Sequence, residues 1–368
     1  MSRPRLAVLM SFSGEGGVER MVMNLVREFA RRDLDVDLLP IRRDSEHLND
    51  VPENVRLIDL GTRHSGTTAW PLSRYLRRER PAALLAAKDR AGRAALLARR
   101  WAGSDTRIVV RLGTNLSAAL EGRSALRRWS RTAPMRRRYR DVDAVVAVSQ
   151  GVADDTMQIT GLPPERLHVI RNPVITPRLS EAALLPVDHP WLGPERERPV
   201  ILGAGRLTRQ KGFDVLLEAF ARLRALRDCR LILLGEGKLR EPLLEQARAL
   251  GVADDLDLPG FDANPWRWMR AADLFALSSR WEGSPNVLTE AMAVGTPVVA
   301  CDCPSGPREI LDGGRVAPLV PVDDVAALAG ALASGLDTPA APEALAEAVN
   351  EYRAEISASR YLELLGLA

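Results

Sequence analysis

The chain has 368 residues, of which 46% are apolar and 27% charged, and its formal net charge is +3. This length suits two domains better than one hydrophobic core. No apolar run reaches the roughly 18 residues that span a membrane. The three cysteines lack the number and spacing of a disulfide framework or a zinc site. The first residues, MSRPRLAVLM, lack the pattern of a cleavable signal peptide, so we expect a cytoplasmic protein.

Charge is distributed unevenly along the chain. Residues 1–180 contain 32 Lys and Arg against 20 Asp and Glu, whereas the remaining residues contain 19 against 28. This asymmetry predicts two domains with different partners. The sequence contains no nucleic-acid-binding module, so we do not expect nucleic acid to be the partner of the basic half.

The first half of the sequence alternates strand-like runs with amphipathic helical stretches such as residues 20–31 and 90–101. This order predicts an α/β domain with a doubly wound parallel sheet, which we assign to residues 1–175. The strands are expected at residues 6–10, 36–41, 55–60, 82–87, 108–112 and 144–148.

Residues 176–199 are rich in proline and have little periodicity, which is typical of a linker. The alternation then restarts, and we assign residues 200–348 to a second doubly wound domain. Residues 342–365 are expected to be helical, and the terminal segment 349–368 can pack back on the first domain. The strands of the second domain are expected at residues 200–203, 231–234, 256–258, 274–277 and 298–300. Two such domains would bind ligands at the carboxyl ends of their strands.

The stretch from Ser279 to Gly295, SRWEGSPNVLTEAMAVG, carries the strongest indication of a binding site. An apolar strand runs into a loop of small residues, and a helix starts near Pro285 or Asn286. The first turn of such a helix presents amides without intrahelical partners at the positive end of the helix dipole, and this arrangement binds anions. Glu282 and Glu290 flank these amides and can accept hydrogen bonds from hydroxyls. A nucleotide sugar has both properties; the alternative is a connection with a purely architectural role.

Arg206 and Lys211 lie five residues apart beside the start of another expected helix. A pair of cations in this position can neutralise a diphosphate leaving group. The alternative is that both are solvated loop charges.

The motif EGSPNVLTEAMAVGTPVVA, in which seven residues separate Glu282 from Glu290, resembles the paired-glutamate motif of retaining glycosyltransferases of family four. The segment CPSGPREI, at residues 303–310, resembles a subgroup that builds bacterial surface polysaccharides and lipid-linked oligosaccharides. The resemblance extends over nearly the whole chain, from GGVER to LVPVDD, and is strong over residues 203–324. It implies the GT-B fold, in which two Rossmann-like doubly wound domains face each other across a cleft.

The resemblance also implies a function, the transfer of a sugar with retention from a nucleoside diphosphate sugar to a glycan or lipid-linked acceptor in cell-envelope glycan synthesis. Two alternatives stay open at this point. One is a nucleotide-sugar epimerase of the same fold, and the other is a non-catalytic nucleotide-sugar-binding protein.

Individual positions take the roles that the resemblance implies. Arg206 and Lys211 would neutralise the diphosphate, Glu282 would contact hexose hydroxyls, and Glu290 would accept from the ribose hydroxyls. Phe261 would border the base. The remaining donor-binding positions that the resemblance implies are Gly16, Gly17, Gly205, Ser284, Pro285, Asn286 and Val287.

The sequence gives no indication of a metal or a nicotinamide cofactor, and we expect the sugar donor to be the only nucleotide bound. The Asp-x-Asp pairs at residues 35/37, 141/143 and 255/257 enter or lie within expected strands instead of following them. Gly14, Gly16 and Gly17 lack the third glycine of the GxGxxG fingerprint.

One position departs from the family. Many relatives have a histidine after the fifth strand of the first domain, but this chain reads VVRLGTNLS there. Arg111 or Asn115 can take that contact, and Lys88 and Asp89 are also expected to face the cleft. The segment 129–140, WSRTAPMRRRYR, combines arginines with aromatic residues. This combination favours a lipid diphosphate acceptor or peripheral contact with an anionic membrane leaflet; a solvated helix face is the alternative.

Overall fold

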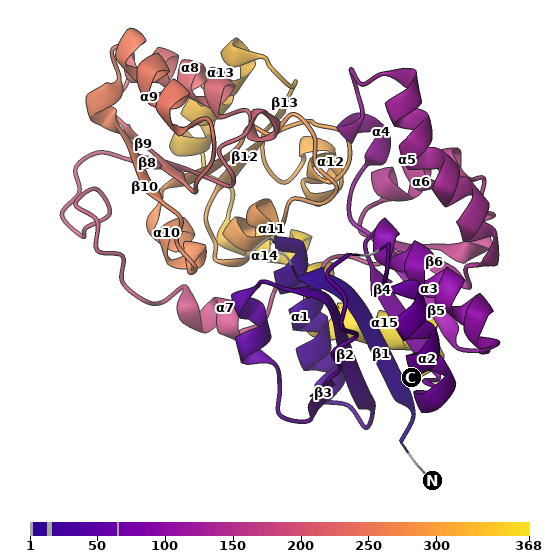
Figure 1. The fold of residues 1–368 in the computed structure, drawn as a ribbon. Helices are drawn as coiled ribbons and strands as arrows, with labels where there is room; N and C mark the ends of the chain where they lie inside the picture. Colours follow the sequence, from indigo (N-terminus) through magenta and orange to yellow (C-terminus); the bar gives the residue numbers. More distant parts are fainter. Residues whose placement is uncertain (1–2, 13–16, 65) are drawn as a thin grey trace. The chain divides into compact units, whose positions relative to one another are not determined.

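The structure, a computed structural model, describes residues 3–12, 17–64 and 66–368. The chain divides into two compact units (Figure 1). The first unit comprises Met1–Val174 together with Tyr352–Ala368, and the second comprises Ile175–Glu351.

The first unit is built on a parallel sheet with the strand order β3-β2-β1-β4-β5-β6-β7. Each predicted strand is present, and the structure adds the short edge strand β7. The strands are β1 (Arg5–Phe12), β2 (Asp35–Arg43), β3 (Val55–Leu57), β4 (Ala83–Ala87), β5 (Arg107–Leu112), β6 (Ala144–Ala147) and β7 (Leu167–Val169). The order reverses between β1 and β4, as in a doubly wound fold, and the prediction of that fold is confirmed.

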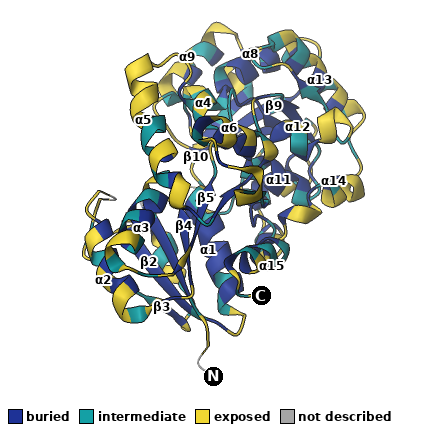
Figure 2. Cartoon of the chain, turned by 90° about the vertical axis from the view of Figure 1, so that its right-hand side faces the viewer, coloured by how far each residue is buried: buried dark blue, intermediate teal, exposed yellow. Residues whose placement is uncertain are grey.

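Helices cover both faces of this sheet because side chains alternate along each strand. On one face, α1 (Gly17–Ala30) and α15 (Ala354–Leu365) pack against each other and share a buried cluster with β1 and β4. A second buried cluster joins the opposite face to α2 (Ala69–Glu79), α3 (Asp89–Ala102), α5 (Ala125–Arg138) and α6 (Gln150–Thr160). Figure 2 shows buried strands at the centre and exposed outer surfaces on α2 and α5. The shorter helices of this unit are α4 (Leu116–Ala119), η1 (Glu46–Asp50), η2 (Tyr139–Asp141) and η3 (Pro164–Arg166).

The second unit has the parallel strand order β10-β9-β8-β11-β12-β13, with a reversal between β8 and β11. Its strands are β8 (Val200–Ala204), β9 (Arg230–Leu234), β10 (Leu256–Gly260), β11 (Leu274–Leu277), β12 (Val298–Cys301) and β13 (Leu319–Val320). The helices are α7 (Pro177–Ala182), α8 (Phe213–Arg224), α9 (Arg240–Ala249), α10 (Pro265–Ala271), α11 (Asn286–Ala293), α12 (Pro307–Ile310), α13 (Val325–Asp337) and α14 (Pro342–Ala348), with short turns η4 (Arg209–Lys211), η5 (Ala253–Asp255), η6 (Asp312–Gly314) and η7 (Asn350–Tyr352).

The expected helical segment 342–365 consists of two α-helices with a short turn between them. α14 ends at Ala348, η7 follows, and α15 begins only after Arg353, whose backbone is extended at φ −65° and ψ 134°. The backbone amide of Val174 donates to the carbonyl of Tyr352 at 2.9 Å, where the chain passes back to the first unit. The apolar residues of α14 pack against α11 of the second unit, whereas those of α15 belong to the core of the first unit. One straight helix could not reach both.

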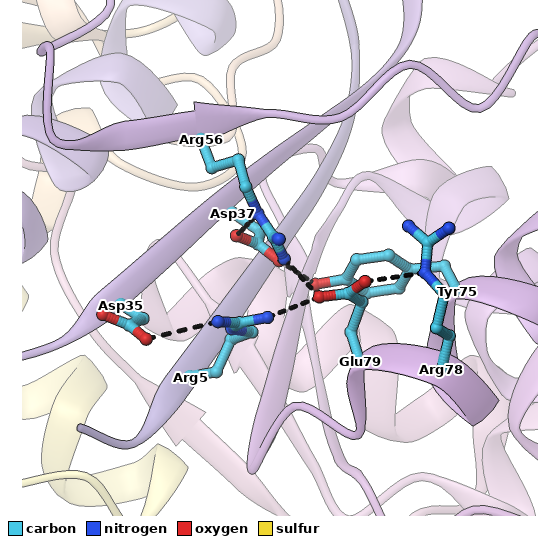
Figure 3. Close-up of polar contacts among 7 residues, drawn as sticks. All are labelled: Arg5, Asp35, Asp37, Arg56, Tyr75, Arg78 and Glu79. Carbon is cyan, nitrogen blue, oxygen red and sulfur yellow. Dashed lines mark hydrogen bonds and ion pairs between the residues drawn. The ribbon is translucent and has the colours of Figure 1, made fainter. Parts of the chain in front are cut away.

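A network of charges lies beside the sheet of the first unit, around the carboxylate of Asp37 (Figure 3). The side chain of Asp37 is only 2% exposed. Arg56 donates to both of its oxygens, at 2.9 and 2.7 Å, and the Tyr75 hydroxyl donates to Oδ2 at 2.5 Å. Burial, together with the hydrogen bond to Asp37, raises the pKa of Tyr75 well above its ordinary value. Arg56 therefore compensates a carboxylate that has almost no access to water.

The network continues through Glu79 on α2, which accepts from Arg56 and Arg5 at 2.5 Å each and from Arg78 at 2.7 Å. Arg5 also reaches Asp35 at 3.3 Å. Hydrogen bonds from Arg56 and then Arg78 hold the pKa of Glu79 below its ordinary value, against the opposing effect of burial. The residues of the Asp35/Asp37 pair are thus bound to arginines.

Replacing Arg56 by Met should destabilise the first unit, because Asp37 would keep its burial and lose its cation. Arg56 is about half exposed, so we expect a loss on the order of 2 kcal/mol in the free energy of unfolding at neutral pH. Urea denaturation measures it. Arg78→Met, which removes a 75%-exposed partner of Glu79, is the matched control and should change little. Equal stabilities of the Arg56 variant and the wild type would contradict this role.

The same substitution should change the response to acid. Stability from a lowered carboxylate pKa is present above the unfolded-state pKa and is lost as the pH falls through the folded-state value. The wild type should therefore lose stability as the pH falls below the ordinary Glu79 value of 4.5, and Arg56→Met should lose less.

Candidate functional site

The candidate site of the second unit lies where its strand order reverses, at the carboxyl ends of β8 and β11. In doubly wound sheets the loops that leave such neighbouring strands in opposite directions open a crevice that binds ligands. The loop after β8 spans residues 205–212, and the loop after β11 spans residues 278–285. These are the two segments that the sequence identified as candidates.

Two glycines allow these loops to approach each other. Gly212 has φ +64°, and a Cβ atom built there would lie 2.1 Å from the carbonyl oxygen of Ser278. Gly205 has φ +149°, and a Cβ there would lie 2.8 Å from Cε of Lys211. Any larger residue would push the loops apart or displace the lysine, so glycine is required for this geometry.

Lys211 and Glu282 form an ion pair across the two loops. The Lys211 ammonium lies 2.6 Å from Oε1 of Glu282, and the two side chains are 14% and 10% exposed. The Ser279 hydroxyl donates to the same oxygen at 2.8 Å, and the Ser278 hydroxyl donates to the Lys211 carbonyl at 2.8 Å. The structure thus brings together two of the predicted site residues, which are 71 positions apart in the chain.

Arg280 connects the two loops, a role that was not predicted from the sequence. Its guanidinium donates to both oxygens of Asp214 at 3.0 and 2.7 Å and to the Arg209 carbonyl at 2.8 Å. Its Nε donates to Asp323 at 2.7 Å. The hydrogen bond to Asp214, followed by the charges of both aspartates, raises the pKa of Arg280 against the effect of burial. An arginine within a loop of small residues was the signal that could have indicated this role.

α11 begins directly after the second of these loops. Pro285 precedes the helix, and no side chain caps it. The Ser284 hydroxyl is buried and has no hydrogen-bond partner among the described residues. Glu290 is fully buried inside the helix. Gly306, at φ +95°, packs so closely on this loop that a Cβ would lie 2.6 Å from Cδ of Pro285.

Arg206 and Phe261 make no hydrogen bond or ion pair with this cluster among the described residues. Arg206 is exposed, and its side chain makes no hydrogen bond or ion pair with the described residues. Phe261 is 55% exposed at the end of β10. Its neighbour Asp262 accepts from Arg267 and Trp268, at 2.6 and 2.7 Å.

The two predicted glycines of the first loop lie in the other unit. Gly16 is outside the described residues, and Gly17 is the first residue of α1. Over residues 3–12, 17–64 and 66–368, no group of three or more His, Cys, Asp or Glu side chains is arranged to hold a metal ion.

The first unit contains a separate cleft of about 1490 Å³. It lies at the carboxyl ends of β4 and β5 and is bordered by α3, α5 and α6. Its charged lining is mainly cationic and includes Lys88, Arg111, Arg93, Arg127 and Arg137. The Asn115 side chain caps α4 by accepting from the Ala118 amide at 3.0 Å.

Comparisons with known proteins agree with this architecture. Residues 15–178 match the family described as Glycosyltransferase Family 4, and residues 198–338 match Glycosyl transferases group 1. The lipopolysaccharide core biosynthesis glycosyltransferase LpsE of Rhizobium meliloti is 28% identical over 96% of this chain and 97% of its own length.

A Campylobacter jejuni relative is the N-acetylgalactosamine-N,N'-diacetylbacillosaminyl-diphospho-undecaprenol 4-alpha-N-acetylgalactosaminyltransferase. It is 32% identical over 50% of this chain, and the match spans only 48% of its own length. The structure of HepE from Anabaena in complex with UDP and glucose has a TM-score of 0.76 at 21% identity, covering 99% of each chain.

The two family matches lie in the two units, one in each, and together they extend over most of the chain from residue 15 to residue 338. They confirm the resemblance that the paired glutamates indicated. The chain belongs to glycosyltransferase family 4 and has the GT-B fold.

Proposed function

We propose that the protein is a retaining glycosyltransferase that moves a sugar from a nucleoside diphosphate sugar to a glycan or lipid-linked acceptor of the cell envelope. The observation that carries this proposal is the Lys211–Glu282 ion pair at the reversal point of the second sheet. The names of LpsE and of the Campylobacter relative support an acceptor of this class. HepE, which has the same fold, was solved with UDP and glucose, and a nucleoside diphosphate sugar is the donor class that we propose here.

The diphosphate would lie between Lys211 and the N-terminus of α11. An ammonium has three donors, and the contact with Glu282 uses one of them. The Ser284 hydroxyl, which has no partner among the described residues, and the positive end of the α11 dipole would add to the attraction of the diphosphate. Arg206 is free to turn toward the same group, because its side chain makes no contact among the described residues.

The two glutamates would hold the two ends of the donor. Glu282 uses Oε1 for Lys211 and Ser279, whereas its Oε2 makes no hydrogen bond within the described residues and can accept from hexose hydroxyls. Glu290, which lies further along α11, would accept from the ribose. In this arrangement Pro285, Asn286 and Val287 form the helix start at the phosphates, and Phe261 borders the base.

Transfer with retention then needs charge stabilisation more than a protein base. The bond between the anomeric carbon and the phosphate oxygen breaks, and the acceptor oxygen bonds to the anomeric carbon from the same face. The acceptor proton passes to the oxygen of the leaving diphosphate. Lys211, Arg206 and the amides of α11 stabilise the charge that develops on this diphosphate.

Lys211→Ala should lower turnover by two orders of magnitude or more, because the loss of such a charge contact in the transition state costs on the order of 3 kcal/mol. Arg206→Ala should behave in the same way. Lys238→Ala, which removes an exposed lysine from the loop after β9, is the matched control. The assay follows sugar transfer with a donor chosen by thermal shift, since a ligand of the folded state raises its melting temperature. Wild-type rates in the Lys211 and Arg206 variants would refute the assignment.

Substitutions of Glu282 and Glu290 should have different effects on the affinity for the free nucleoside diphosphate. Glu290→Gln should weaken the affinity for the free nucleoside diphosphate, because the ribose contact does not need the sugar. Glu282→Gln should leave that affinity nearly unchanged and chiefly impair transfer. Titration calorimetry with the nucleoside diphosphate measures the difference. Equal losses of affinity in both variants would contradict this division.

We also propose that the first unit docks peripherally on an anionic membrane leaflet through residues 129–140 and the turn before them. Leu126 and Trp129 on α5 are 75% and 65% exposed, and arginines surround them. Exposed aromatic and basic residues together suit a lipid headgroup region, where each basic residue contributes roughly 1 kcal/mol. Among the helices that the structure describes, none is long and apolar enough to cross a membrane.

Liposomes that contain anionic lipid should sediment with the protein, and the bound fraction should fall as salt is added. Replacing Arg136, Arg137 and Arg138 by Ser should reduce binding and leave donor affinity unchanged. The control replaces Arg222, Arg248 and Arg270, which are exposed arginines of the second unit. Because Arg136 donates to the Ile159 carbonyl at 2.6 Å, thermal melting must show that the variant is folded. Wild-type protein that stays in the supernatant at low salt would exclude membrane docking.

A further inference from the structure

The floor of the cleft in the first unit holds a buried arginine whose donors are incompletely used. Arg111 is the second-last residue of β5 and is 1% exposed. Its Nη2 donates to Oδ1 of Asn172 at 2.5 Å, whereas Nε and Nη1 make no hydrogen bond of good geometry with the described residues. The Tyr361 hydroxyl lies near this guanidinium: burial raises the pKa of Tyr361, and Arg111 opposes that rise. A buried guanidinium with unmet donors is costly, and such groups usually bind something.

The residue that follows β5, Gly113, packs against this guanidinium. Gly113 lies so close that a Cβ atom built there would be 3.3 Å from Nη1 of Arg111. A side chain at this position would crowd the guanidinium. Both Gly113 and Arg111 line the cleft.

Lys88, after the neighbouring strand β4, brings a second cation to the same place. Its backbone has φ +78° and ψ 148°, a conformation that residues other than glycine rarely adopt. Its amide donates to the Arg111 carbonyl at 3.0 Å, and its ammonium lies 3.8 Å from Oε1 of Glu19. Burial lowers the pKa of Lys88, and the charge of Arg111 lowers it further, whereas Glu19 opposes this change. Strained backbone of this kind is typical of functional sites.

Apart from Glu19, which lies 3.8 Å from the Lys88 ammonium, few acidic side chains among the described residues balance this pair. Within the described residues the acidic lining of the cleft consists of Asp89 and Asp155. Asp89 accepts from Arg93 at 3.0 Å, and Asp155 accepts from the Leu116 amide at 2.7 Å. The cleft therefore has a strong excess of positive charge, and an anion is the ligand that relieves it.

Apolar side chains form part of the same lining, including Leu97, Leu116, Leu120, Trp129 and Met135. A free sugar acid would leave the accessible members of this set, Leu97, Leu116 and Trp129, in contact with water. A phosphate ester that carries a hydrocarbon chain would cover them and pair its charge with the arginines.

We propose that Lys88 and Arg111 bind the diphosphate of a lipid-linked acceptor, with its hydrocarbon chain along the apolar lining of this cleft. The inference rests on the proposed function and names the anionic group that the acceptor must carry. Both cations come from the carboxyl ends of adjacent strands, so they are held on the rigid part of the unit. Arg111 would offer two donors to one phosphate group, and Lys88 would add a point charge.

The experiment measures binding of farnesyl diphosphate, a short lipid diphosphate, to the full chain by titration calorimetry. Saturating nucleoside diphosphate is present throughout, to occupy the donor site of the second unit. We expect Arg111→Gln and Lys88→Gly each to weaken binding tenfold or more. Lys88→Gly removes the ammonium from a backbone conformation that glycine tolerates, but it also leaves the buried Glu19 without this cation, so thermal melting must show that the variant is folded.

Arg100→Gln, an exposed substitution on α3 outside the cleft lining, is the control and should bind as the wild type does. Wild-type affinity in the folded Lys88→Gly variant would overturn the site. Inorganic pyrophosphate, tested in the same way, distinguishes a site for a lipid-linked diphosphate from a site for any free diphosphate. If it binds as tightly as farnesyl diphosphate, the lipid-linked acceptor is overturned. An unchanged affinity for the nucleoside diphosphate in these variants distinguishes failure of this site from failure of the donor site.

Discussion

The ion pair between Lys211 and Glu282 is the contact on which the proposed donor site depends. Each residue sits on a loop that leaves the carboxyl end of a different strand, and these two strands flank the reversal point of the sheet. The loops can approach closely there because Gly212 has no side chain to meet the Ser278 carbonyl, and Gly205 leaves room for the Lys211 side chain. A buried ion pair is weak evidence for stability, since desolvation offsets much of its attraction. Its value here is that it fixes a lysine beside the uncapped start of α11.

Arg280 connects the two loops of this arrangement through its hydrogen bonds. Its side chain donates to Asp214, Asp323 and the Arg209 carbonyl. These hydrogen bonds tie the two loops to each other and to the start of α8. The ammonium of Lys211 therefore does not need to be reorganised when a diphosphate arrives. Preorganised charge of this kind is the largest contribution that many enzymes make to lowering a barrier.

Much of the fold could be predicted from the sequence, because the central strands are short, almost wholly apolar runs separated by amphipathic helices. The edge strands β7 and β13 were missed because they have only three and two residues and lack a clear pattern. The break between α14 and α15 could not be located from the sequence. Helical periodicity shows that a segment has an apolar face, but not which hydrophobic core that face packs against. Nothing in the local sequence pattern marks the point at which the chain leaves the second unit and returns to the first.

Part of the candidate site could also be predicted from the sequence. Glu282, Glu290 and Lys211 stood out through spacing and neighbouring small residues. Arg280 and Asp214 did not, because they are 66 positions apart and their pairing depends on the tertiary fold. The unmet donors of Arg111 were also beyond the sequence, since a strand arginine is usually expected to reach solvent.

The central claim is that Lys211 and the start of α11 recognise a diphosphate. The most direct test compares the affinities for a nucleoside diphosphate and the matching nucleoside monophosphate, in the wild type and in Lys211→Met. The account predicts that the wild type prefers the diphosphate by tenfold or more and that the variant loses most of this preference. An undiminished preference in the variant would contradict it.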